Sequence, residues 1–156
     1  MFEIKIAEKL NDALSGGALE NAIAFMGFLD AHEITQADEY AMCYKGECVC
    51  YIDTRKEKHL WIVWTEGDYS HEREDYPIDE HTKEIAWVNV MKCGNCEGVS
   101  CSPGKTKTIF GKDFTNICNA DNVNMTFMFT NPDSETLECV KKLVLMRKSI
   151  IGELKQ

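Results

Sequence analysis

This chain of 156 residues contains no long apolar run, few prolines and no excess of basic residues. The longest apolar stretch, residues 22–29, is far shorter than the roughly 20 residues that span a bilayer. The first residues contain no apolar signal-peptide core. With only three prolines and no linker or low-complexity tract, residues 1–156 are expected to form a single domain. We therefore expect a cytoplasmic protein without a membrane partner.

Basic residues are outnumbered by acidic ones, 17 to 26, which gives a net charge of −9. A chain of this charge repels phosphate backbones unless its lysines gather on one surface. The composition therefore predicts that the protein does not bind nucleic acid.

Cysteine, in contrast, is abundant, and four of the eight cysteines are clustered in sequence: Cys93, Cys96, Cys101 and Cys118. Their spacing, C-x2-C-x4-C-x16-C, is typical of thiolates that hold one zinc ion in a tetrahedron. The surrounding Gly, Ser and Lys residues bury little apolar surface, so a bound metal would supply the order. We predict a structural zinc site with no open position for catalysis. An iron–sulfur cluster, a redox pair at Cys93 and Cys96, and unliganded loop thiols remain as alternatives.

A second group, Cys43, Cys48 and Cys50, flanks Lys45-Gly46, a dipeptide that suits a two-residue hairpin turn. This turn places Cys43 opposite Cys48, and strand alternation is expected to put Cys50 on the same face. Three thiols on one face could carry redox or electrophile chemistry or bind a metal. The alternative is that they are small buried hydrophobes.

Hydrophobic periodicity predicts an α+β fold with a mainly antiparallel sheet of about four or five strands and helices packed on it. The predicted helices cover residues 2–14, 18–30, 77–91 and the chain after Asn131. The third has Ile85 and Val88 among its apolar positions and could also extend as a strand. The predicted strands cover residues 40–44, 47–53, 59–66 and 124–130. Residues 59–66 are apolar on both faces and should be central. Asn131 is expected to cap the last helix, with Pro132 at its first position. The predicted apolar face of this helix consists of Leu137, Val140, Val144 and Ile151.

The predicted chain begins with a helix, two hairpin strands and a Trp/Ile/Val strand. It ends with an aromatic strand at 127–129, Asn-Pro-Asp at 131–133 and a Lys-Lys-Leu helix. This pattern covers about two-thirds of the chain and resembles small bacterial YdhG-like domains of unknown function. The resemblance implies a helix-flanked antiparallel sheet and no established chemistry, so it assigns no catalytic residue. Residues 93–118 depart from the family pattern and are interpreted as an inserted zinc knuckle.

Two weaker patterns are also present. Residues 71–75 with Asp79, Glu80 and His81 could bind a metal or supply acid–base groups, although a solvated charged loop explains them better. Several aromatic side chains could line a concave face or simply fill the core: Trp61, Trp64, Trp87, Tyr44, Tyr51, Phe127 and Phe129. Trp61 and Trp64 must lie on opposite sides of their strand. Residues 98–106 fail the phosphate-loop pattern because five residues separate the glycines.

Together these patterns favour a binding module over an enzyme. The predicted ligand is a small molecule or a protein, and zinc has a structural role. One alternative is a thiol-based enzyme or sensor that uses Cys43, Cys48 and Cys50. Another is an oligomeric interaction module such as a homodimer. No catalytic residue is assigned.

Overall fold

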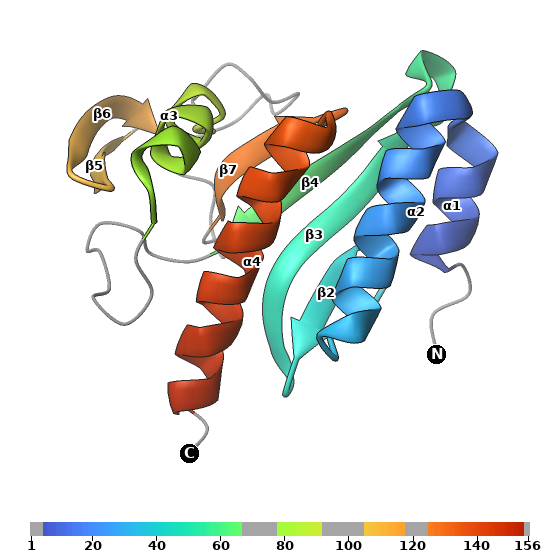
Figure 1. Ribbon diagram of the computed structural model, residues 1–156, viewed down its shortest axis with the longest axis horizontal. Coiled ribbons are helices and arrows are strands. Elements are labelled where there is room, and N and C mark those ends of the chain that lie inside the picture. Colours follow the sequence, from blue (N-terminus) through green and yellow to red (C-terminus); the bar gives the residue numbers. More distant parts are fainter. Residues whose placement is uncertain (1–4, 67–77, 92–104, 118–124, 155–156) are drawn as a thin grey trace.

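The computed structural model describes residues 5–66, 78–91, 105–117 and 125–154, which form the α+β fold that the hydrophobic pattern predicts (Figure 1). The helices are α1 (Ile6–Ala13), α2 (Gly16–Ala31), α3 (Glu80–Val88) and α4 (Ser134–Leu154), with a short 3-10 helix η1 (Lys56–Lys58). The strands are β1 (Thr35–Gln36), β2 (Ala41–Tyr44), β3 (Glu47–Arg55), β4 (Leu60–Glu66), β5 (Lys105–Ile109), β6 (Lys112–Ile117) and β7 (Met125–Thr130). No helix of these segments is long and apolar enough to cross a membrane.

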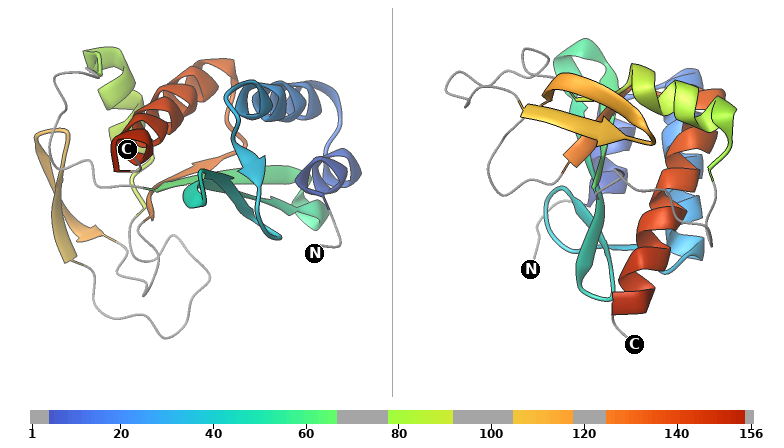
Figure 2. Two further views of the ribbon diagram at one scale, coloured as in Figure 1. Left: turned by 90° about the horizontal axis from the view of Figure 1, so that it is seen from below. Right: turned by 90° about the vertical axis from the view of Figure 1, so that its left-hand side faces the viewer.

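The main sheet has five strands in the order β1-β2-β3-β4-β7, and every neighbouring pair is antiparallel. β4 lies between β3 and β7, in agreement with its two apolar faces. Helices α2 and α4 lie side by side over the same face of the sheet (Figure 2). The α1 helix lies near the end of β3, where Lys9 approaches Asp53 at 3.9 Å. Helices α2 and α4 therefore cover one face of the sheet, and α1 lies at its end.

The register shows which side chains face these helices, because directly paired residues share a face. Ile52, Val63 and Phe129 are paired across β3, β4 and β7, and all are fully buried. Trp61 belongs to the same face and packs against Phe25 of α2, with 6.0 Å between the ring centroids. The apolar core thus lies between the sheet and the helices.

A separate hairpin, β5–β6, occupies part of the segment that the sequence predicts to be only a zinc knuckle. Its turn contains Phe110 and Gly111 with φ angles of 50° and 82°, so the glycine relieves strain at the second position. Phe110 is buried and stacks on Phe127 with 6.3 Å between ring centroids. Trp87 of α3 donates its indole N–H to the carbonyl oxygen of Ile109 over 2.8 Å. These contacts attach the hairpin to the main sheet and to α3.

The ambiguous segment after residue 77 is a helix, α3, that begins directly after Asp79. Its buried positions are Thr82, Lys83 and Ala86. Val88, which the sequence places on the apolar face, is instead 84% exposed. The buried side of this short helix includes Thr82, which faces Lys142 of α4.

The predicted cap of α4 is wrong. Asn131 adopts a φ of 48°, and its backbone N–H donates to the carbonyl oxygen of Trp61 over 2.7 Å. Because this bond continues the β4–β7 pairing, the helix cannot begin at Pro132. Asp133 caps it, and its Oδ1 accepts from the N–H of Thr136 over 2.8 Å. The predicted apolar face is confirmed by four buried side chains: Leu137, Val140, Val144 and Ile151.

Candidate functional site on the open face of the sheet

The four cysteines predicted to hold zinc, Cys93, Cys96, Cys101 and Cys118, lie outside the described residues. The predicted zinc site therefore stays a prediction. Residues 71–75 of the acidic loop also lie outside the described part of the chain. Within that part, no group of three or more His, Cys, Asp or Glu side chains could hold a metal ion.

The hairpin cysteines do not share one face. The turn at Lys45-Gly46 is confirmed, and Cys43 pairs with Cys48 as expected. A β-bulge next to this pair makes Met42 the partner of Cys50. Since Met42 and Cys43 are consecutive, their side chains point to opposite faces, and Cys50 follows Met42 into the core with no exposed surface. Cys43 and Cys48 are partly exposed on the other face.

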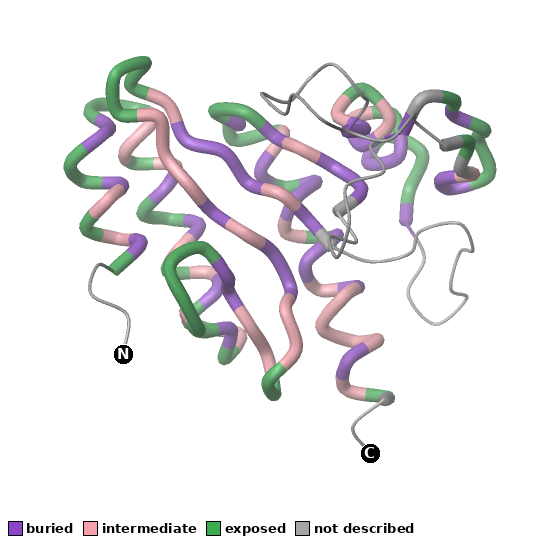
Figure 3. Tube along the Cα trace, turned by 180° about the vertical axis from the view of Figure 1, so that it is seen from behind, coloured by how far each residue is buried: buried purple, intermediate pink, exposed green. Residues whose placement is uncertain are grey.

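That other face, which we call the open face, bears one row of paired residues across four strands: Ala41, Tyr51, Trp64 and Met128. Figure 3 views the molecule from this side, and no described helix crosses the row. Tyr51, Trp64 and Met128 are partly exposed, whereas Trp61 lies on the covered face, as the sequence predicts. Phe127 and Phe129 also belong to the core, so only part of the predicted aromatic face exists.

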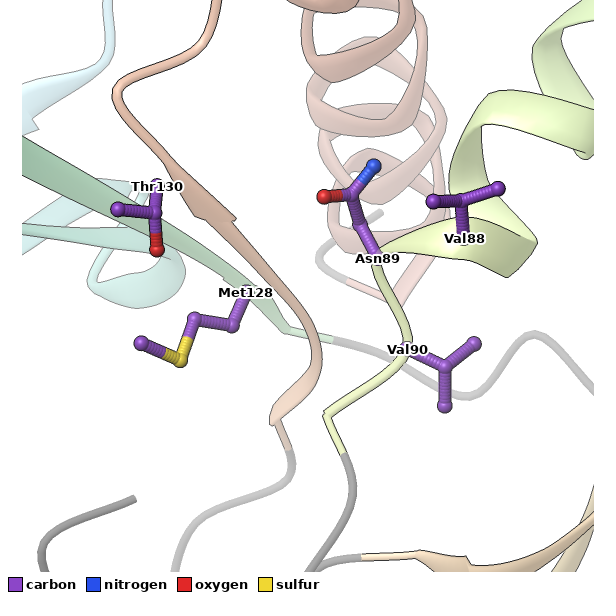
Figure 4. Close-up of a pocket in the computed structure, with 5 residues that line it drawn as sticks. All are labelled: Val88, Asn89, Val90, Met128 and Thr130. Atoms are coloured by element: carbon purple, nitrogen blue, oxygen red, sulfur yellow. The ribbon is translucent and has the colours of Figure 1, made fainter. Parts of the chain in front are cut away.

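At the β7 end of the row lies a hollow of about 310 Å³. Figure 4 shows Met128 and Thr130 of β7 on one side and the end of α3, with Val88 and Asn89, on the other. The sequence does not identify this site, because Val88 reads as a core position. Its exposure, 84%, is the highest of the large apolar side chains in the described segments.

The edge of β7 next to the hollow is only partly paired. The N–H of Met128 donates to the carbonyl oxygen of Asn89, and the N–H of Met91 donates to that of Thr126, both over 2.9 Å. Antiparallel strands direct the backbone groups of alternate residues to the same side. The C=O of Met128 and the N–H of Thr130 therefore point outward as well. In a regular ladder the N–H of Asn89 would donate to the carbonyl oxygen of Met128, but it donates to that of Ala86 instead. Among the described residues, the segment after α3 therefore supplies no partner to either group.

A polar cluster between α3 and α4 accounts for the acidic residues around Asp79. The Oγ1 of Thr82 donates to Oδ1 of Asp79 over 2.5 Å, and the Lys142 ammonium donates to the same oxygen over 3.1 Å. These two bonds hold the pKa of Asp79 at about 2. His81 lies 3.0 Å from a carboxylate oxygen of Glu135. The cluster joins two helices by hydrogen bonds, so it is interpreted as structural.

Cys139 lies beside the same cluster and was not singled out by the sequence. Its Sγ donates to the carbonyl oxygen of Thr82 over 3.5 Å. Burial raises the pKa of this thiol to about 12. A thiol of this pKa is almost entirely protonated at neutral pH and is a poor nucleophile.

Comparison with known proteins does not assign the chain to a family. No protein family, curated protein or solved structure matches the chain. The candidate site is therefore defined by its own geometry: the open-face row, the hollow beside Val88, and the outward backbone groups of β7.

Proposed function

We propose that this chain is a protein-binding module that receives an extended, apolar segment of a partner on the open face, beside the edge of β7. The observation that carries the proposal is the row of Tyr51, Trp64 and Met128, which leads to the hollow beside Val88. The described helices leave this row uncovered.

A protein partner fits this site better than a small molecule. Tyr, Trp and Met are enriched in the buried centres of protein interfaces, where charged residues are depleted. Small-molecule pockets usually surround most of the ligand, whereas this hollow lies open beside a strand edge. The outward C=O of Met128 and N–H of Thr130 are the groups to which an added strand bonds. An extended peptide matches both the apolar row and this edge.

We also propose that Cys93, Cys96, Cys101 and Cys118 hold one structural zinc ion. The support is their number and the C-x2-C turn, which presents two thiolates together. Zinc would order the glycine-rich stretch that precedes β5, and it has no part in partner recognition in this proposal.

Selection from a random peptide library tests the binding proposal. Peptides enriched on the immobilised protein would be synthesised, and their affinity measured by fluorescence anisotropy. Val88→Asp places a charge at the hollow, and Trp64→Ala removes the centre of the row. We expect either substitution to weaken binding at least tenfold, equivalent to about 1.4 kcal/mol. N-methylation of the peptide amide that bonds to Met128 should weaken binding similarly.

Ile23→Asp is the matched control, because Ile23 is an exposed apolar residue on α2, 41% exposed and away from the open face. This variant should bind like the wild type. Enriched peptides that bind the Val88→Asp and Trp64→Ala variants as tightly as the wild type would contradict the proposal. A wild-type dimer that Val88→Asp dissociates, detected by light scattering, would instead make a second copy of the chain the occupant.

A further inference from the structure

The β2–β3 hairpin carries a pair of thiols that the binding proposal does not use. Cys43 and Cys48 are direct partners two positions from the tip of the hairpin, and both are partly exposed on the open face. We propose that these two cysteines form a reversible cross-strand disulfide by exchange with a low-molecular-weight disulfide. The hairpin would thus be a site of redox modification.

The turn fixes the geometry of the pair. Lys45 and Gly46 have φ angles of 50° and 82°, the two positive values that a type I′ turn requires. Such a two-residue turn is closed by a hydrogen-bonded pair, here Tyr44 and Glu47. The next pair, Cys43 and Cys48, is therefore a non-hydrogen-bonded pair, in which side chains approach most closely.

This pair type meets the requirements of a disulfide. The Cα atoms of non-hydrogen-bonded partners lie about 4.5 Å apart, and disulfides join Cα atoms separated by about 4.4–6.8 Å. The two side chains also leave the sheet on the same face, so neither strand has to rotate. The hairpin can accept the bond with little backbone movement.

The β-bulge determines which cysteines react. Cys50 follows Cys48 by two residues and would be on the same face of a regular strand. Because the bulge turns Cys50 into the core, it has no exposed surface and faces away from Cys43. Cys139 is buried on α4, where it donates to Thr82. Among the described cysteines, Cys43 and Cys48 are therefore the reactive pair.

The exchange proceeds in two balanced steps. A thiolate of one cysteine attacks a sulfur of the small disulfide, forms a mixed disulfide and releases one small thiolate. The second protein thiolate then attacks the protein sulfur of this mixed disulfide and displaces the second small thiolate. Two protein thiols are oxidised, one small disulfide is reduced to two thiols, and the two cysteine protons pass to the released thiolates. An excess of a small thiol reverses both steps.

The bond would be regulatory and not a structural support. A disulfide stabilises a fold mainly by closing a loop in the unfolded chain, and the gain is small when the loop is short. This loop contains only the hairpin tip, so the oxidised form gains little and remains easy to reduce. Oxidation would instead restrict the backbone at the hairpin end of the open face, next to Ala41 and Tyr51.

Mass spectrometry tests the inference on the intact, metal-replete protein. Reduced protein would be incubated with oxidised glutathione, alkylated and digested with trypsin. Cleavage after Lys45 separates Cys43 from the peptide of residues 46–55, which contains Cys48 and Cys50. A disulfide across the hairpin then appears as two linked peptides, and dithiothreitol should abolish the link.

Cys50→Ala is the decisive variant, since it leaves a single cysteine in the second peptide. We expect this variant to form the linked peptides to the same extent as the wild type. Cys48→Ala should lose the link and accumulate glutathione on Cys43, and Cys43→Ser should accumulate it on Cys48. Loss of the link in Cys50→Ala would overturn the inference, as would stable glutathione adducts on both Cys43 and Cys48 of the wild type.

Discussion

At the scale of single residues, Thr65 illustrates how a buried hydroxyl affects stability. It lies on the covered face between Cys50 of β3 and Phe127 of β7 and has no exposed surface. Its hydroxyl has no hydrogen-bond partner among the described residues. Burying such a group without a partner is unfavourable. Thr65→Val replaces the hydroxyl with a methyl group of similar size, and we expect the free energy of unfolding to increase by about 1 kcal/mol.

Urea denaturation measures this change. Thr65→Ser is the matched control, because it keeps the hydroxyl, removes a buried methyl group and should decrease the free energy of unfolding. A Thr65→Val protein that is less stable than the wild type would contradict the prediction.

The face of the sheet to which a side chain points can be predicted wherever the strand is regular. Strand alternation correctly places Trp61 and Trp64 on opposite faces. It fails for Cys50 because a bulge adds one residue to β3, and one added residue reverses the facing of every residue beyond it. Neither composition nor periodicity marks that position. The thiol pair could therefore be predicted from the turn, whereas the exclusion of Cys50 required the structure.

At the scale of elements, the start of α4 can be tested by substitutions at two nearby positions, which should affect stability differently. Asp133→Ala removes the cap that accepts from Thr136 and should decrease the free energy of unfolding by about 1 kcal/mol. Asn131→Gly should be neutral or slightly stabilising, because a φ of 48° is easier for glycine. Thermal unfolding followed by circular dichroism measures both. A larger decrease in the free energy of unfolding for Asn131→Gly than for Asp133→Ala would indicate that Asn131 is the cap after all.

The elements with strong periodicity or clear end signals could be predicted from the sequence. They include α4, the β2–β3 hairpin and the central strand β4. The two-residue strand β1 is too short to leave a pattern. The sequence does not indicate the β5–β6 hairpin, because its lysines and threonines resemble a polar loop, although Gly111 is a turn signal. The partly unpaired edge of β7 depends on how α3 ends, which is a tertiary property.

At the scale of the whole molecule, the proposed zinc site predicts how much metal the protein contains and that the rest of the fold survives loss of the metal. Protein purified under reducing conditions should contain about one zinc ion per chain, the value for one closed four-cysteine site. Cys93→Ser should release it. The described helices and the main sheet have a large apolar core of their own, so far-ultraviolet circular dichroism should change little. Metal-free wild-type protein, found by elemental analysis, would contradict the site.

The strand order also bears on how the chain reaches this structure. α1, α2 and strands β1 to β4 follow one another in sequence and in space, so they can associate through short loops. β7 pairs with β4 only after the whole segment 67–124 has been spanned. Loop-closure entropy increases by only about 0.6 kcal/mol for each doubling of loop length, but such long-range pairing slows folding. The return of β7 to β4 would then be the slow step of folding, and a change in the length of the intervening segment would alter its rate only weakly.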